Sequence, residues 1–111
     1  MRDDRERLLD IVEAATRVAA IVAMGRDRYE NDSVVQDALI RRLEIIGEAA
    51  TKVGEELKVR HPTLPWRRAA ATRNRIVHGY FDVDLDLLWE IAVRDVPALA
   101  DELRGIIDEL S

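Results

Sequence analysis

The sequence contains no cysteine, which excludes disulfide bonds, thiolate-ligated zinc and cysteine nucleophiles and is compatible with a reducing cytoplasm. Only 5% of its residues are aromatic, and it has only three prolines and five glycines. Turn-rich sheet proteins use more of these residues, so the composition favours helices. The chain also starts with charged residues and has no long apolar run there, so we expect neither a signal peptide nor a membrane span, and therefore a cytoplasmic protein.

What the sequence does contain is sufficient for one domain. A chain of 111 residues can bury a single core but not two. Apolar residues make up 48% of it, and many of them recur at helical spacing. We therefore expect residues 1–111 to form one all-α domain, an up-and-down bundle of four to five helices.

The first half of the chain has the pattern of two long helices. The first is predicted from Asp3 to about Met24 and ends at Gly25. Residues 26–32 then form a polar link, and Ser33 with Gln36 has the spacing of a capping box that opens the second helix. The apolar stripes are Leu8, Ile11, Val12, Ala15, Val18, Ala19 and Val22 in the first helix, and Val35, Ala38, Leu39, Ile46, Ala49, Val53 and Leu57 in the second.

One charged residue falls on the second stripe, where Arg42 lies between Leu39 and Ile46. A guanidinium there has to reach the surface, pair inside the protein, or enter a site or subunit interface. We expect it to reach the surface.

The second half begins with a break at residues 61–65, where two prolines interrupt the helical pattern. Pro65 can occupy the first position of a third helix that continues to about His78 and stops at Gly79. Asp84 is predicted to cap a fourth helix, and Pro97 marks a break or kink before the last one. The apolar positions of these C-terminal helices are Leu85, Leu88, Trp89 and Ala92, followed by Val96, Leu99, Leu103, Ile106, Ile107 and Leu110.

Charge is distributed unevenly along the chain. The formal net charge is −5, which alone argues against a nucleic-acid ligand. However, no Asp or Glu occurs between Leu57 and Phe81. The rest of the chain therefore has 11 of the 17 basic residues against all 22 acidic residues. The six basic residues of the interval are Lys58, Arg60, Arg67, Arg68, Arg73 and Arg75. Such a basic island is either a solvated face or a phosphate-binding surface.

The basic island contains the most informative residues of the chain, which are Arg73, Asn74, Arg75, His78 and Tyr80. On one helix, Arg73 and His78 lie about 140° apart, whereas Asn74 and His78 share a face. One helix therefore presents two adjacent polar stripes rather than one tight site. The arrangement makes more sense if two copies meet, so that each subunit borders a shared groove.

These groups suit the cleavage of RNA by its own 2′-hydroxyl. The reaction needs a base, an acid and a cation for the charge that builds on the phosphoryl oxygens. His78 can serve as base or acid near neutral pH, and Arg73 can hold the phosphate. The alternative is structural: a histidine at a helix C-terminus commonly stabilises the helix dipole, and surface arginines commonly stay hydrated.

A family resemblance favours the catalytic interpretation. The run Pro65-Trp66-Arg67 and the spacing Arg73-Asn74-x-x-x-His78-x-Tyr80-Phe81 resemble the R-x4-H-x-Y motif of the HepT-like branch of HEPN-domain proteins. The segments at residues 42–49, 89–91 and 95–97 also resemble parts of that family, so the similarity covers nearly the whole chain.

The resemblance implies a HEPN-like homodimer whose motif Arg and His, here Arg73 and His78, line a cleft at the dimer interface. It implies a metal-independent endoribonuclease without cofactors, the toxin of a type II/VII-like toxin–antitoxin system. Its partner would be a minimal nucleotidyltransferase antitoxin, which in this family adenylylates the motif tyrosine, here Tyr80. Asn74, which matches the polar residue often following the motif arginine, would contact phosphate or orient a catalytic group. We assign the remaining substrate contacts to Arg75, Arg67 and Arg68 of the basic island.

A second hypothesis is a non-catalytic HEPN binding module whose basic groove docks a nucleotidyltransferase or a nucleic acid. It predicts binding without cut ends. A metal site is not predicted, because the calcium-loop spacing that starts at Asp82 has Leu87 and Val93 where glycine and glutamate are required.

Overall fold

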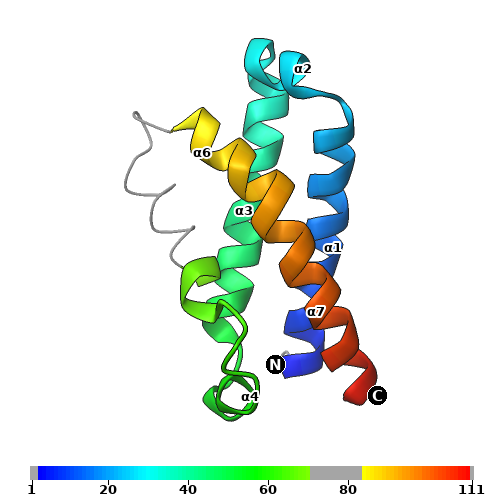
Figure 1. Cartoon of the computed structure of the whole chain (residues 1–111), viewed down its shortest axis with the longest axis vertical. Coiled ribbons are helices and arrows are strands. Elements are labelled where there is room, and N and C mark those ends of the chain that lie inside the picture. Colours follow the sequence, from blue (N-terminus) through cyan, green and yellow to red (C-terminus); the bar gives the residue numbers. More distant parts are fainter. Residues whose placement is uncertain (1–2, 71–83, 111) are drawn as a thin grey trace.

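The computed structural model describes residues 3–70 and 84–110, and in these ranges the chain forms helices and loops without any strand. The predicted all-α bundle is thereby confirmed. The molecule measures 41 × 27 × 26 Å along its principal axes. Two long helices, α1 (Asp4–Ala23) and α3 (Ser33–Lys52), run in opposite directions. The C-terminal helices cross them so that the N- and C-terminal ends of the chain lie at the same end of the bundle (Figure 1).

The first helix, α1, runs from Asp4 to Ala23. Its N-terminus is capped by Asp3, whose Oδ1 accepts a hydrogen bond of 2.8 Å from the Glu6 N–H. At the other end Gly25 adopts a φ of 94°, a left-handed conformation that costs glycine little. Gly25 therefore stops the helix as the sequence predicts.

The predicted polar link after α1 is wrong, because α2 runs from Arg26 to Asn31. Its helical turns are supported by the ion pairs Arg26–Glu30 and Arg28–Asp32, each four residues apart. A six-residue helix has too little apolar periodicity to be recognised in the sequence.

The second long helix, α3, runs from Ser33 to Lys52, and its cap differs from the predicted capping box. Asp32 is the cap, since its Oδ1 accepts from the Val34 N–H at 2.9 Å. The Gln36 side-chain amide instead donates to the main-chain carbonyls of Tyr29 and Glu30. The amide thus ties α3 to α2 rather than closing the helix end.

The predicted second helix is split in two. α3 ends at Lys52, and α4 begins at Glu55 and ends at Arg60. Between them the Gly54 N–H donates to Asp4 Oδ1 at 3.0 Å, and a Cβ at Gly54 would lie 3.2 Å from the other carboxylate oxygen. The chain turns there against the start of α1, although Val53 and Leu57 on either side are both buried as predicted.

The C-terminal part is one rod built from α6 (Leu85–Glu90), the π-helical segment η1 (Ile91–Asp95) and α7 (Val96–Glu109). Asp84 caps it as predicted, because its Oδ1 accepts from the Leu87 N–H at 3.0 Å. At η1 the Val96 N–H bonds to the Ile91 carbonyl five residues back. This wider turn precedes Pro97, which has no N–H to donate, so the predicted break at Pro97 is a π-turn inside a continuous rod.

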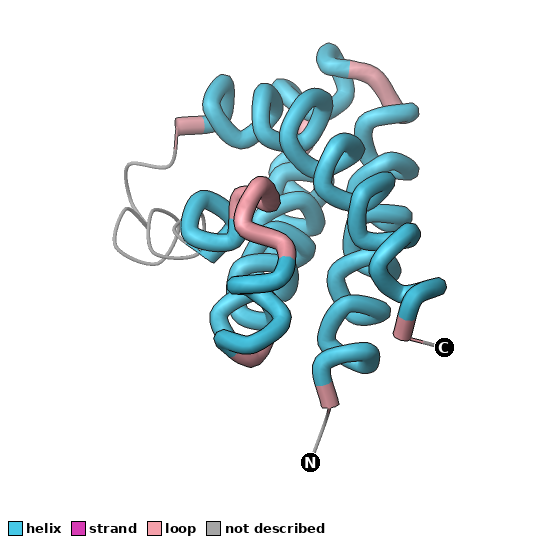
Figure 2. Tube along the Cα trace, turned by 60° about the horizontal axis from the view of Figure 1, so that its bottom comes forward, coloured by secondary structure: helices cyan, strands magenta, loops and turns pink. Residues whose placement is uncertain are grey.

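The core lies where α1 packs against both α3 and α7. Figure 2 shows the bundle turned so that the end with both chain termini comes forward. Completely or almost completely buried side chains from all three helices meet in this core: Leu8, Ile11, Val18, Leu39, Leu43 and Leu103. Two predicted core alanines, Ala19 and Ala38, are exposed instead. Alanine tolerates either environment, so its place in an apolar stripe carries little information.

Candidate functional site

Five of the predicted site residues, Arg73, Asn74, Arg75, His78 and Tyr80, lie outside the described residues and their roles stay predictions. The predicted end of the third helix at Gly79 also lies there. The structure does show how the chain is held on either side of this motif segment, residues 71–83. It also shows where Arg67 and Arg68 lie.

The chain upstream of the motif segment is anchored by Trp66. Residues 66–70 are helical, and the Ala69 N–H donates to the Pro65 carbonyl at 2.9 Å. Pro65 therefore precedes the helix instead of occupying its first position, one residue from the prediction. The Trp66 indole N–H donates to the His61 carbonyl at 3.0 Å, and only 8% of the residue is exposed. Trp66 is thus a core anchor, which leaves its ring little surface on which a base could stack.

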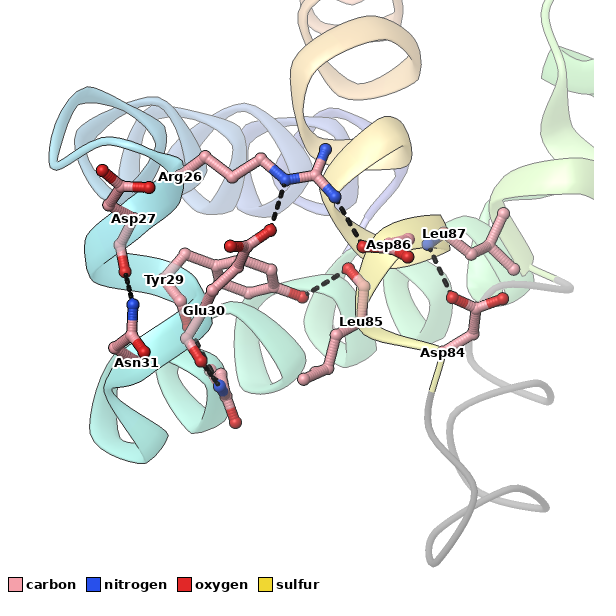
Figure 3. Close-up of polar contacts among 10 residues, drawn as sticks. Arg26, Asp27, Tyr29, Glu30, Asn31, Asp84, Leu85, Asp86 and Leu87 are labelled. Carbon is pink, nitrogen blue, oxygen red and sulfur yellow. Dashed lines mark hydrogen bonds and ion pairs between the residues drawn. The ribbon is translucent and has the colours of Figure 1, made fainter.

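The chain downstream of the motif segment is held by α2 (Figure 3). The hydroxyl of Tyr29 donates to the main-chain carbonyl of Leu85 at 2.7 Å. The Arg26 guanidinium bridges two carboxylates, Glu30 on its own helix and Asp86 on α6. The first turn of α6 is therefore fixed by α2 as well as by its own cap.

Tyr29 is the central residue of this anchor. It is 1% exposed, and its ring lies 5.0 Å from the ring of Trp89 with the planes tilted by 32°. Burial raises the pKa of the Tyr29 hydroxyl to about 12, and the nearby carboxylates of Asp86, Asp84 and Glu30 act in the same direction, while Arg26 opposes them. Sequence reasoning missed this residue; the signal that could have revealed it is an aromatic ring inside an otherwise polar stretch.

A groove runs along α4 and the residues that lead to the motif segment. We call it the α4 groove; it has a volume of about 570 Å³, and its described lining reaches Ala70, directly before that segment. Among the described lining residues there are three cations and one carboxylate, that of Glu55. The described residues of the lining are Thr51, Glu55, Lys58, Val59, Pro62, Leu64, Pro65, Trp66, Arg67, Arg68 and Ala70.

The structure brings Arg67 and Arg68 together with Lys58 at this groove. Both arginines are exposed, which suits their predicted role in substrate binding. They differ in one respect: Arg68 Nη1 lies 3.8 Å from Asp95 Oδ1, so part of its charge is directed towards η1. In the part of the chain that the structure describes, no hydrogen bond or ion pair joins the side chain of Arg67 to another residue.

The structure also shows the environments of Arg42 and of His61, the one histidine among the described residues. Arg42 is half-buried beside Leu43, which takes the core position on α3. This is consistent with the expectation that its guanidinium reaches the surface. His61, at the end of α4, has a buried Nε2 that lies 3.8 Å from Glu109 Oε2 and forms no hydrogen bond within the described residues. Its main-chain carbonyl accepts from the Trp66 indole N–H.

No group of three or more His, Asp or Glu side chains within residues 3–70 and 84–110 could hold a metal ion. No helix in these ranges is long and apolar enough to cross a membrane.

Comparisons with a family model and with individual known proteins point to the same family. The family model described as "Ribonuclease HepT-like" matches residues 11–106. The protein named "Probable ribonuclease HepT" from Thermococcus cleftensis is 35% identical over 106 residues, which cover 95% of this chain and 96% of the relative. "Putative RNase MJ1380" from Methanocaldococcus jannaschii is 35% identical over 104 residues, covering 93% and 95%. No solved structure matches the chain significantly.

Proposed function

The chain belongs to the family of HepT-like ribonucleases, and on that premise we propose that it is a metal-independent endoribonuclease with Arg73 and His78 as its catalytic residues. The single observation that carries the proposal is the match of the family model to residues 11–106, which include the whole Arg73–Tyr80 motif. The α4 groove gives independent support, because it presents cations next to the segment that carries that motif.

The proposed reaction is a transesterification within the RNA backbone. The 2′-hydroxyl oxygen attacks the adjacent phosphorus, the bond from phosphorus to the 5′-oxygen breaks, and the products carry a 2′,3′-cyclic phosphate and a 5′-hydroxyl. One group removes the proton of the 2′-hydroxyl, and another protonates the departing 5′-oxygen. An imidazole with an ordinary pKa near ~6.5 can perform either step at neutral pH.

His78 supplies one of these proton transfers, and His78 of a second protomer supplies the other. The proposal therefore includes a homodimer in which both copies of the motif border one cleft. Arg73 neutralises the charge that accumulates on the phosphoryl oxygens in the transition state, for which a planar guanidinium is well suited. Asn74 orients the phosphate or the imidazole.

Substrate binding is assigned to Arg75 and to the two arginines at the α4 groove, Arg67 and Arg68. The surrounding chain is acidic, with a formal net charge of −5 for the whole protein. Attraction of RNA therefore depends on a local positive field, and a cation-lined groove beside the motif segment provides one.

We further propose that the protein acts in the cytoplasm as the toxin of a toxin–antitoxin pair. The antitoxin would be a nucleotidyltransferase that transfers AMP to Tyr80, two residues after His78. Adenylylation would place a bulky anion beside the catalytic groups and exclude RNA by repulsion and by steric hindrance. An intact-mass measurement of the protein co-expressed with a nucleotidyltransferase antitoxin should show the mass of one added AMP per chain, which the variant Tyr80→Phe should lack.

The nuclease activity itself is tested on the protein alone. Purified protein should cleave RNA in the presence of EDTA, and His78→Ala should abolish cleavage while its circular dichroism spectrum stays unchanged. RNA binding without any cut ends would instead support the alternative function, a binding module that docks RNA or a nucleotidyltransferase.

A further inference from the structure

We infer that the α4 groove is a second RNA subsite that holds a single-stranded stretch of the substrate outside the scissile bond, with Lys58 and Arg67 as its phosphate contacts. The inference rests on the proposed function and extends it, because Lys58 lies on α4 at some distance along the sequence from the motif. No comparison assigns a role to this groove.

The described lining of the α4 groove carries more positive than negative charge. Lys58 is half-buried, and within the described ranges its ammonium forms no hydrogen bond or ion pair, like the guanidinium of Arg67. Most other arginines on the described helices are paired with a carboxylate three or four residues away, as in Arg17–Glu13 and Arg104–Asp101. The side chains of Arg7, Arg42 and Arg60 likewise have no partner among the described residues, but Lys58 and Arg67 are two such cations that line the same concavity.

The lining of the groove combines cations with apolar side chains. It is contributed by the end of α3, by α4 and by residues 62–70, and it includes the buried residues Leu64 and Trp66. Val59, also in the lining, is 72% exposed and offers an apolar surface on which a ribose or base can lie. A groove that presents both cations and apolar surface suits a nucleic-acid single strand, whose phosphates and bases need both.

The α4 groove is continuous along the chain with the segment that carries the proposed catalytic residues. The groove includes Ala70, and the next residues along the chain are those of the motif segment. A strand whose scissile phosphate is held by Arg73 has to leave the catalytic residues in some direction. The α4 groove is the cation-lined surface, within the described part of the chain, that directly adjoins the motif segment.

Binding is measured with a fluorescent single-stranded RNA of about 12 nucleotides, a length within the range that one small binding fold covers. Every ribose carries a 2′-O-methyl group, so the probe cannot be cut by 2′-oxygen attack, and fluorescence anisotropy reports the Kd alone. Loss of one phosphate contact should lower the slope of log affinity against log salt by about 0.7, equivalent to about fivefold in Kd at 0.1 M salt.

We expect Lys58→Ala to raise the Kd by about fivefold at 0.1 M salt, and the double variant with Arg67→Ala to raise it by about 25-fold. Arg17→Ala is the matched control, because it also removes one positive charge but lies on α1 and is paired with Glu13. Its Kd should equal that of the wild type. Glu55→Gln should tighten binding by a similar factor, which is informative because a damaged fold rarely gains affinity.

An unchanged Kd in Lys58→Ala and Glu55→Gln would overturn the inference, as would an equal loss in Arg17→Ala. If these variants instead weaken only the association with a nucleotidyltransferase, the groove is a protein-docking surface and the inference is also overturned. Failure of the subsite can be distinguished from failure of the proposed function. If the protein cuts ordinary RNA but its Kd does not depend on Lys58, the ribonuclease function stands and the subsite is wrong. If the Kd depends on Lys58 but the protein never cuts RNA, the binding groove stands and the ribonuclease function is wrong.

Discussion

The hydroxyl of Tyr29 on α2 donates a hydrogen bond of 2.7 Å to the main-chain carbonyl of Leu85, 56 residues further along the chain. Leu85 is the first residue of α6, two residues after the motif segment ends. A short helix that the sequence pattern does not reveal therefore fixes the point at which the chain returns from its proposed catalytic residues.

Removing this hydroxyl should destabilise the protein moderately. We expect Tyr29→Phe to lower the free energy of unfolding by about 1 kcal/mol at pH 7, because the ring and its contact with Trp89 remain while one hydrogen bond is lost. Urea unfolding followed by circular dichroism measures the difference. A variant as stable as the wild type would show that the bond contributes nothing net.

The same pair of proteins should respond differently to alkaline pH. Burial raises the pKa of Tyr29 to about 12, above its ordinary value near ~10. The unfolded state therefore loses this proton first, and the stabilisation present below pH ~10 is lost as the pH rises towards 12. The stability advantage of the wild type over Tyr29→Phe should shrink across that interval, whereas an advantage that is constant up to pH 12 would contradict the raised pKa.

The cap of α6 gives a prediction with a built-in control. Asp84→Ala should cost about 1 kcal/mol, because the Leu87 N–H loses its acceptor. Asp84→Asn should be nearly neutral, since asparagine caps helices about as well as aspartate. Thermal unfolding of both variants checks the pair. Equal losses in the two would indicate that the carboxylate charge matters instead of the capping bond.

Two glycines with open space around them should respond in opposite directions to alanine. A Cβ at either Gly25 or Gly105 would meet no atom within 4 Å, so only the backbone decides the outcome. Gly25 has a φ of 94°, and Gly25→Ala should destabilise the protein by about 1 kcal/mol or more. Gly105 lies inside α7 on its exposed face, so Gly105→Ala should stabilise it by up to about 1 kcal/mol. Changes of the same sign would contradict this account of the two positions.

The long elements of the fold were predictable from the sequence because they follow simple periodic rules. The stripe on α7 and the Asp84 cap of α6 are confirmed in place, and α1 ends at Gly25 as expected. Each depends on interactions within a few residues along the chain. Local patterns of this kind are visible without knowledge of the tertiary structure.

The sequence predictions are wrong where contacts between distant parts of the chain determine where a helix ends or what a side chain binds. The helix predicted to continue through Val53 breaks at Gly54, where a main-chain N–H bonds to Asp4 from the start of the chain. Gln36 is predicted to close a capping box, but its side-chain amide instead donates hydrogen bonds to two main-chain carbonyls of α2. Neither partner lies where a local pattern could identify it, and the same holds for Tyr29 and Leu85.

The candidate site, like the fold, could be predicted from the sequence only where neighbouring residues along the chain identify it. The motif residues Arg73 and His78 stand out in the sequence because of their chemistry and spacing, and Arg67 and Arg68 because of the basic island. Lys58 belongs to that island too, but only the structure places it with the two arginines at one groove. The convergence of two separate segments on one surface cannot be derived from either segment alone.

The most direct test of the central claim is an RNA cleavage assay with the purified protein in excess EDTA, together with analysis of the product ends. We predict cuts that leave 2′,3′-cyclic phosphates and 5′-hydroxyls. The rate should fall by at least about 100-fold in His78→Ala, and the Arg17→Ala protein should cut like the wild type. Cleavage that persists in the folded His78→Ala variant, or the absence of cleavage by the wild type, would contradict the proposed function.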